Sequence, residues 1–322
     1  MTSNKKTTEQ PLDYARGGQN NETVAISDGN GFAGDGATEI KHETTLFAEP
    51  IFHVGSFTVT NALLTSWIAV ALLVVLAITL WKKLSEVPRG IQNVFEVFIE
   101  GALALCDQVT SDRKKSLKIF PIAASVFLFV LVNNWFGILP GVGSIGFIET
   151  AEGHAAFIPF LRGGTADLNT TLALSILAVV GSNIFGIVSI GAWKSLNKFI
   201  NLKALAEIPK KILKDPTVLI VNPIHFFVGI IEIIGEFAKV ASLSFRLFGN
   251  VFAGEVLLAA MSAIFAYGTP IPFIFLEVLV GFIQALIFSM LTLVYFTIAA
   301  ESHDDHEEVK RLNTVTPEYQ KS

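Results

Sequence analysis

The chain has 322 residues, of which 52% are hydrophobic and only 16% are charged, and its mean hydropathy is +0.57. Soluble domains carry about 25% charged residues, so this composition excludes an ordinary soluble domain. Of the 28 acidic residues behind the net charge of -5, 12 lie in the two tails at 1–45 and 303–322, and no nucleic-acid partner is expected. A single cysteine, Cys106, excludes an intrachain disulfide and a cysteine-based metal site, and is best interpreted as a small helix residue.

Residues 1–45 form a polar extension rich in Gly, Asn, Thr and Asp. Such a composition cannot bury enough apolar surface to fold alone, so the sequence predicts a disordered segment. No apolar run follows its first lysines, which argues against a secretory signal. Gly29, Gly31 and Gly34 spell GxGxxG, but no βαβ unit follows, and we expect no cofactor.

Residues 46–302 are predicted to form the membrane domain, because five stretches in this region contain no Asp, Glu, Lys or Arg. Each exceeds the roughly 20 residues that a helix needs to cross about 30 Å of hydrocarbon. Alternation typical of barrel strands is absent, so these stretches predict five crossings in an all-α integral membrane protein. The stretches are Val54–Trp81, Ile119–Ile148, Leu168–Trp193, Val256–Leu276 and Val278–Ala300.

Between the first two crossings, the segment IQNVFEVFIEGALALCDQV is amphipathic and too mixed to span a membrane. It predicts one interfacial helix that lies on the membrane surface. The region from Lys82 to Lys118 holds seven basic residues and that from Lys194 to Lys214 holds six, whereas Gly141–Asn169 holds only Arg162. Basic loops stay cytoplasmic, so we expect the amino terminus outside and the carboxyl terminus inside.

The tract Ala241–Val256 places Arg246 among apolar residues. A guanidinium in hydrocarbon costs about 2.5–3.5 kcal/mol on insertion scales, which makes it a functional residue by default. At 100° per residue, one polar stripe follows this helix, and Glu255 lies about 180° away from Arg246. The stripe also contains Glu232, Glu236, Lys239, Ser242 and Asn250.

The last apolar segment carries a second polar stripe, in which Gln284 follows Glu277 by seven residues and Tyr295 follows eleven further on. Beside it lies a row of small residues that allows another helix to approach closely. Its members are Gly281, Ala285 and Ser289, and Gly249 and Gly254 on the preceding helix are interpreted as close-packing positions. Two glutamates and an arginine within a membrane resemble an ion path that contains a fixed charge.

Structural roles are the alternative for several of these residues. Glu232 and Glu236 precede Arg246 by 14 and 10 residues, which is too far along one helix for a direct pair. Glu232 and Lys239 could instead snorkel to the inner surface. Asn250 and Gln284 could simply join two helices by a hydrogen bond.

Glu255 and Glu277 are harder to explain by structure alone, because no basic residue lies near either in the sequence. The polar tail at residues 303–322 contains His303 and His306 beside two aspartates. Nothing fixes their geometry, so the tail is predicted to be solvated and no metal site is expected.

The segment SLSFRLFGNVFAGE at 242–255 is similar to the signature of subunit a of the rotary F-type ATP synthases. The chain resembles that family over about Thr45 to His303. Further matching segments are LVNNWFGILPGVG, ADLNTTLAL, NPIHFF and QALIFSMLTLVYFTIAAESH. The resemblance implies an all-helical stator whose last two helices are long and tilted against a rotor ring, with two offset aqueous half-channels.

The resemblance also implies roles for residues at matching positions. Arg246 occupies the place of the essential arginine that separates the half-channels and keeps the rotor carboxylate ionised as it passes. Asn250, Glu255 and Gln284 match positions of the outer half-channel and the rotor interface. Matches toward the inner half-channel are Glu232 and Lys239, and matches at the polar entry to the fourth helix are Asp167 and Asn169.

The Glu277 position is His in some relatives and Glu in others, often changing together with the Glu255 position. Both are Glu in this chain, so the resemblance leaves open which of them relays the ion. The choice between H⁺ and Na⁺, and between ATP synthesis and hydrolysis, is open as well.

The function implied is that of a non-catalytic stator subunit that couples proton translocation to rotation of the c-ring. Implied partners are the c-ring, the peripheral-stalk b subunits, the remaining ATP synthase subunits and the lipid bilayer of an energy-transducing membrane, such as the bacterial inner membrane. A phosphate loop of the GxxxxGK[ST] type is absent from the sequence, as expected if ATP chemistry belongs to partners. The alternatives are a purely structural anchor and a free-standing transporter or channel, although the sequence lacks the inverted repeats of a transporter.

Overall fold

The computed structural model describes residues 40–41, 47–82, 90–139, 141–151, 154–191, 218–265 and 268–301. These residues all belong to the larger of two compact units, which covers Glu39–Ser322. The GxGxxG motif, the inner basic region 194–214 and the histidines of the carboxyl-terminal tail lie outside the described residues.

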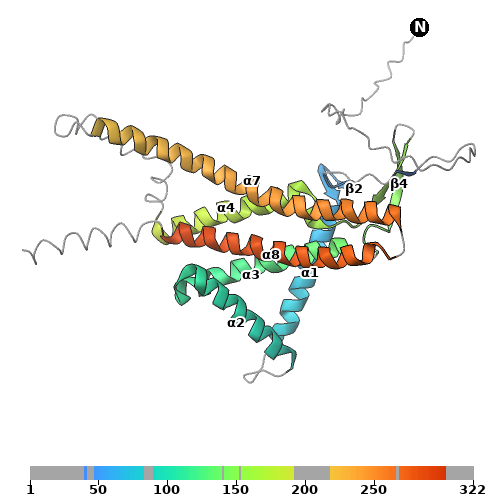
Figure 1. Ribbon diagram of the computed structural model, residues 1–322, viewed down its shortest axis with the longest axis horizontal. Helices are drawn as coiled ribbons and strands as arrows, with labels where there is room; N and C mark the ends of the chain where they lie inside the picture. Colours follow the sequence, from blue (N-terminus) through green and yellow to red (C-terminus); the bar gives the residue numbers. More distant parts are fainter. Residues whose placement is uncertain are drawn as a thin grey trace, which may run out of the picture. The chain divides into compact units, whose positions relative to one another are not determined.

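Five described helices are long and apolar enough to cross a membrane, which confirms the predicted all-α membrane architecture (Figure 1). The last two are much longer than the others, as expected. At about 1.5 Å per residue, the 47 residues of α7 extend about 70 Å, more than twice the thickness of the hydrocarbon. The five helices are α1 (Asn61–Lys82), α3 (Arg113–Ile138), α4 (Leu168–Ile190), α7 (Val218–Ile264) and α8 (Pro270–Glu301).

Helix α2 (Ile91–Thr110) matches the predicted interfacial segment and is strongly amphipathic. Its buried apolar side chains, Leu103 and Cys106, pack with Ile119 and Ala123 of α3 and with Leu293 and Phe296 of α8. Because one face of α2 rests on these helices while most of its other residues are exposed, the amphipathic pattern reflects packing against the bundle.

Hydropathy misplaced one helix boundary. The uncharged stretch Val256–Leu276 is not one helix: α7 ends at Ile264 and α8 begins at Pro270. Gly268 between them has φ +100°, a conformation that L side chains rarely adopt, and proline is favoured at the first turn of a helix. A chain reversal that is built from apolar residues carries no signal in a count of charges.

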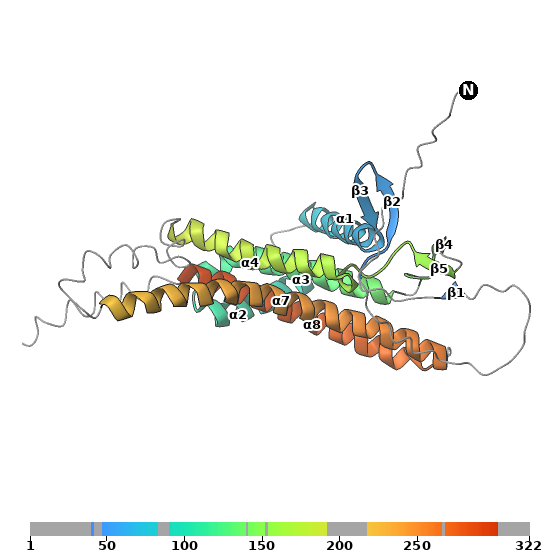
Figure 2. The same ribbon diagram turned by 90° about the horizontal axis from the view of Figure 1, so that it is seen from above.

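Short strands, which the sequence analysis did not anticipate, occupy the ends of two of the uncharged stretches. β2 (Pro50–Val54) and β3 (Phe57–Thr60) form a hairpin that leads into α1. β4 (Gly146–Ala151) and β5 (His154–Pro159) form a second hairpin after α3, and β1 (Ile40–Lys41) pairs in parallel with β5. In Figure 1 the β4–β5 hairpin lies near the end of the bundle where α7 ends and α8 begins, and Figure 2 shows the β2–β3 hairpin beside α1.

The main core lies where α3, α4, α7 and α8 meet. The row of small residues on α8 packs against α3, as predicted: Gly281 lies against Asn134 and Trp135, and Ser289 donates a hydrogen bond to the carbonyl oxygen of Ala123 at 2.7 Å. Buried core side chains are Phe127, Val130, Leu131, Ala178, Leu243, Leu247, Val251, Ala285 and Phe288. This packing fixes which faces of α7 and α8 oppose each other.

Candidate polar path between the long helices

The polar stripes of α7 and α8 face each other. Asn250 donates a hydrogen bond from Nδ2 to Oε1 of Gln284 at 2.7 Å. Farther along the pair of helices, the Lys239 ammonium lies 5.3 Å from the centroid of the Tyr295 ring. The spacing of seven and eleven residues on α8 therefore predicted correctly which side chains share the interface.

A small cavity lies among α3, α7 and α8. Its polar lining comes from Asn134, Asn250, Glu277 and Gln284, with apolar side chains between them. Oε2 of Glu277 and Nε2 of Gln284 are buried and have no hydrogen-bond partner among the described residues. Buried polar atoms normally have partners, so these two atoms mark a place suited to water or to a transferred proton.

Glu277 lies directly over the backbone of α7 at Gly254. A Cβ atom built on Gly254 would come within 2.1 Å of Oε1 of Glu277, so a larger residue there would require the Glu277 side chain to move. The close-packing prediction is thus confirmed for Gly254. For Gly249 the described part of the chain provides no such contact, because a Cβ there would meet nothing within 4 Å.

Glu255, the next residue on α7, makes an ion pair with Arg162 of the connection between β5 and α4. Nη2 and Nε of Arg162 lie 2.9 and 3.2 Å from the same oxygen, Oε2 of Glu255. Only 10% of the Arg162 side chain and 19% of the Glu255 side chain are exposed. Glu255 thus contacts the connection between β5 and α4. This agrees with its position about 180° from Arg246, which predicted a neighbour different from that of the Arg246 face.

The connection that carries Arg162 is packed into the bundle. The backbone amide of Arg162 donates to Oγ1 of Thr65 at 3.2 Å, and Oγ1 of Thr165 donates to Oδ1 of Asn134 at 2.6 Å. Gly163 lies against Gly137 of α3 with a Cβ clearance of 3.2 Å. Hydrogen bonds to α1 and α3 therefore hold this stretch in place.

Asp167 and Asn169 stand at the start of α4. The carboxylate of Asp167 is buried and accepts hydrogen bonds from the backbone amides of Asn169 and Thr170 at 3.3 and 3.2 Å, and from that of Ala48 at 3.1 Å. This is a helix N-cap that also attaches the strand region before α1. The Asn169 side chain is exposed.

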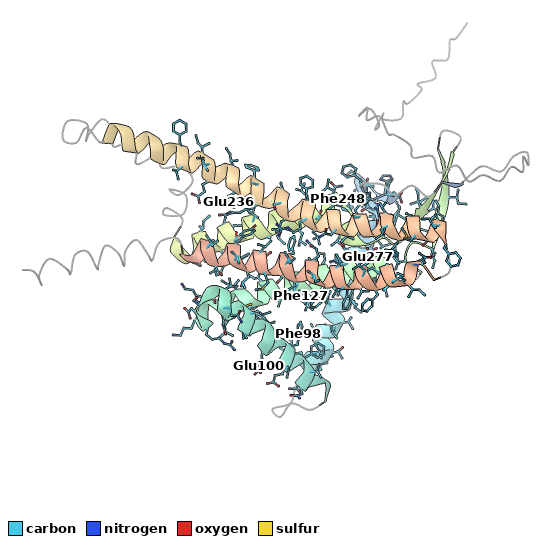
Figure 3. The ribbon with its side chains drawn as sticks, in the orientation of Figure 1. Phe98, Glu100, Phe127, Glu236, Phe248 and Glu277 are labelled. Atoms are coloured by element: carbon cyan, nitrogen blue, oxygen red, sulfur yellow. The ribbon has the colours of Figure 1, made fainter. Side chains whose placement is uncertain are left out.

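A second polar cluster joins α4, α7 and α8 at a different level. Glu236 accepts hydrogen bonds from Nδ2 of Asn183 at 3.1 Å and from Nζ of Lys239 at 2.7 Å. Lys239 in turn lies over Tyr295, and Glu232 is half-buried one turn away on α7. Figure 3 shows Glu236 and Glu277 far apart along the α7–α8 pair.

Arg246 lies between the two clusters on the same helix. Its side chain is exposed, and it makes no hydrogen bond or ion pair with any residue in the described part of the chain. Glu236 precedes it by ten residues and Glu255 follows it by nine, about 15 and 14 Å of helix. An unpaired cation thus separates two polar regions.

Sequence reasoning missed three members of these clusters as partners. Arg162 was visible only as the single basic residue of 141–169, and its ion pair spans 93 positions. Asn134 and Asn183 are polar residues in apolar helices, a signal that could have drawn attention to them. Spacing along the chain does not show which distant helix such a residue contacts.

Fold and site together define a helical membrane protein with two polar clusters and, between them, an arginine that has no ion-pair partner among the described residues. The family model described as ATP synthase A chain matches residues 63–297. Among similar proteins, ATP synthase subunit a of Syntrophobacter fumaroxidans is 32% identical over 77% of this chain and 87% of that protein. The chain belongs to the ATP synthase subunit a family.

Two further relatives with the same description are similar to this chain to nearly the same degree. ATP synthase subunit a of Gloeobacter violaceus is 33% identical over 76% of this chain and 86% of its own length. That of Moorella thermoacetica is 29% identical over 79% of this chain and 96% of its own length. The matched region contains α3, α4, α7 and nearly all of α8, and hence both polar clusters.

Proposed function

We propose that this chain is the stator of a rotary motor, in which Arg246 couples proton movement to rotation of the c-ring. As a member of the subunit a family, it is a multi-pass protein of the ATP synthase membrane sector and takes part in proton transport. The proposal adds two half-channels, the arginine between them and the ring that turns against it.

The position of Arg246 carries this proposal. A continuous polar path would let protons leak through the protein without doing work, whereas a fixed positive charge between two separate paths blocks that leak. An exposed guanidinium can also attract a carboxylate on another chain and favour its ionised form. A proton must then be delivered to that carboxylate before it can leave the arginine.

The outer half-channel, in this proposal, runs through the cavity between α3, α7 and α8. Asn250 and Gln284 bind water, and one of the two carboxyls, Glu255 or Glu277, exchanges the proton. Asp167 and Asn169 lie near the entry, where Asp167 also caps α4. The unpartnered Gln284 and Glu277 atoms support a hydrated route here.

The inner half-channel runs past Lys239, Glu232 and Glu236. Glu236 is added to Glu232 and Lys239 in this half-channel because it connects Asn183 of α4 with Lys239 on α7. Protons released from the ring carboxylate would leave by this cluster. The ring lies against the exposed face around Arg246, and the b subunits bind elsewhere on the chain.

The topology follows from the same proposal. The hairpins and the α7–α8 turn lie outside, the amino terminus is outside and the carboxyl terminus is inside, in an energy-transducing membrane such as the bacterial inner membrane. The basic residues Lys114, Lys115 and Lys118 at the start of α3 support this orientation.

Crosslinking in the native complex tests the proposal. Ser242 lies on the exposed face beside Arg246, so Ser242→Cys in a Cys106→Ser background should crosslink to a small ring subunit carrying a cysteine next to its membrane carboxyl. Val70→Cys on the exposed face of α1 is the matched control and should not. A native complex without a ring, or equal crosslinking from both sites, would favour a free-standing transporter or channel.

A further inference from the structure

We propose that Arg162 is a positioning residue that keeps Glu255 as a permanent anion, so that Glu277 is the carboxyl that exchanges the proton on the outer side. The inference rests on the proposed function and answers a question that the resemblance leaves open. Its basis is the different surroundings of two glutamates that lie side by side.

The Arg162–Glu255 pair is held by two hydrogen bonds to one carboxylate oxygen, at 2.9 and 3.2 Å, and both side chains are largely buried. Protonating Glu255 would leave the buried guanidinium without this counter-ion. Breaking one side of a buried pair is strongly unfavourable, so Glu255 is poorly suited to repeated proton exchange.

Arg162 cannot easily follow a change at Glu255, because its backbone is fixed. Its amide bonds to Thr65, and Thr165 three residues later bonds to Asn134. A Cβ on Gly164 would lie 2.2 Å from Oδ1 of Asn133, which shows how tightly the connection fits against α3. The guanidinium is thus presented to α7 from a rigid base.

Glu277 has the opposite surroundings. Within the described residues no basic side chain pairs with it, its Oε2 atom is buried without a partner, and it lines the cavity with Asn250 and Gln284. From α7, the charged group that faces Glu277 is Glu255, which is paired with Arg162. From α3, the neutral amide of Asn134 contributes to the same cavity. Glu277 can therefore change its protonation state without breaking an ion pair.

The arrangement explains why two glutamates can stand at adjacent levels of the interface. Arg162 compensates the charge of Glu255, and Gly254 leaves room for Glu277 against the α7 backbone. One carboxylate then fixes the connection between β5 and α4 to α7, while the other remains available to water in the cavity.

Proton flux in vesicles containing the intact ATP synthase tests the division of roles. Passive uptake is measured under a potassium diffusion potential for Arg162→Gln, Glu255→Gln, their double variant and Glu277→Gln. Each single change in the pair should lower uptake about tenfold, because it removes one side of a largely buried ion pair. The double variant should return to within about threefold of wild type, because two amides can replace a buried pair, whereas Glu277→Gln should stop uptake.

The pH profile separates positioning from a merely structural effect. The pH of half-maximal uptake should move in Arg162→Gln, where the negative charge beside Glu277 loses its ion pair with Arg162, and should return to the wild-type value in the double variant. Loss of packing alone would lower the rate without moving this midpoint. Arg113→Gln is the matched control, since it removes an arginine from an exposed pair with Asp107 and should change neither rate nor midpoint.

Three results would overturn the inference: uptake in the double variant as low as in Glu255→Gln, retained uptake in Glu277→Gln, or failure of the double variant to assemble. If Arg162→Gln alone does not assemble, Glu255→Gln, the double variant and Glu277→Gln still distinguish the two roles. Normal ATP-driven pumping by Arg246→Ala would instead overturn the proposed function, whatever the Arg162 variants do.

Discussion

Arg162 and Arg246 are both arginines of the membrane domain, but their environments are opposite. Arg162 is buried in a packed connection and has its carboxylate partner within the chain. Arg246 is exposed on α7 and has no hydrogen-bond or ion-pair partner among the described residues. A charge that is compensated internally organises the protein, whereas one that is presented outward can act on a charge that another chain brings.

The same contrast distinguishes the two polar clusters. Asn134 and Gln284 of the proposed outer half-channel are buried beside a cavity, and Nε2 of Gln284 has no hydrogen-bond partner among the described residues. In the inner cluster, Glu236 is bonded to both Asn183 and Lys239. We therefore expect changes in the outer cluster to affect proton entry more than changes in the inner cluster affect proton exit.

Removing the outward-facing arginine should have the largest effect. Arg246→Ala should reduce ATP-driven proton pumping by about 100-fold or more, the range found when a preorganised charged or polar group is removed from a reaction site. Arg246→Lys should also fail to couple, since lysine keeps the charge but loses the planar guanidinium. Pumping is measured by fluorescence quenching in vesicles, with assembly checked by the amount of the chain in the membrane. Wild-type pumping by either variant would show that the contrast between the arginines has no functional meaning.

Closing the outer cavity should have the next largest effect. Gln284→Leu replaces polar lining by methyl groups and leaves Nδ2 of Asn250 without its partner, so passive proton uptake should fall about tenfold. Ser289→Ala, five residues further on α8, removes a buried hydrogen bond to α3 and is the matched control. Equal losses in both variants would mean that helix packing, and not the cavity, limits uptake.

A smaller effect is expected in the inner cluster. Glu236→Gln removes the negative charge beside Lys239 while keeping an acceptor for Asn183, and should lower ATP-driven pumping by about three- to fivefold. Glu100→Gln on the exposed face of α2 changes the same residue type away from both clusters and should pump normally. If Glu232→Gln affects pumping and Glu236→Gln does not, the inner path follows Glu232 instead.

These experiments concern residues that the sequence predicted unequally well. Periodicity within one helix identified the stripes, and the Asn250–Gln284 and Lys239–Tyr295 contacts confirm how they face each other. Hydropathy predicted the number of crossings and the approximate place of four of them, because length and apolar content are local properties, but it placed the fourth at Val256–Leu276 instead of along α7. It could not find the α7–α8 turn, whose residues are as apolar as the helices beside it.

The sequence also did not predict contacts between residues that lie far apart along the chain. Glu255 was noted for having no basic neighbour along the chain, although Arg162 lies against it in the fold. A helical wheel gives the direction in which Glu255 points but not which element comes to meet it. The packing of the β5–α4 connection against α1 and α3 decides that, through contacts such as Arg162–Thr65 and Thr165–Asn134.

The orientation of α3 can be tested with the smallest expected effect on activity, by placing one cysteine at each end of this helix. Lys114 in its first turn and Ser144 beyond its last residue are both exposed, and the 26 residues of α3 extend about 39 Å. Lys114→Cys and Ser144→Cys in a Cys106→Ser background should pump normally and react with an impermeant maleimide from opposite sides, Ser144→Cys from outside. Labelling of both from one side would overturn the topology.

Cys106 itself should label slowly, which makes the wild-type chain a control for the same experiment. Burial in the α2–α3 contact, together with the neighbouring charge of Asp107, raises the pKa of the Cys106 thiol above its usual value. The thiolate is the form that reacts, so at pH 7 to 8 even less of it is present than in an exposed cysteine, and the rate should keep rising as pH increases beyond the point where exposed cysteines level off. Labelling of Cys106 as fast as that of Ser144→Cys at pH 7 would show that α2 does not rest on α3 in the membrane. The buried face of α2 would then have to be covered by something other than this bundle.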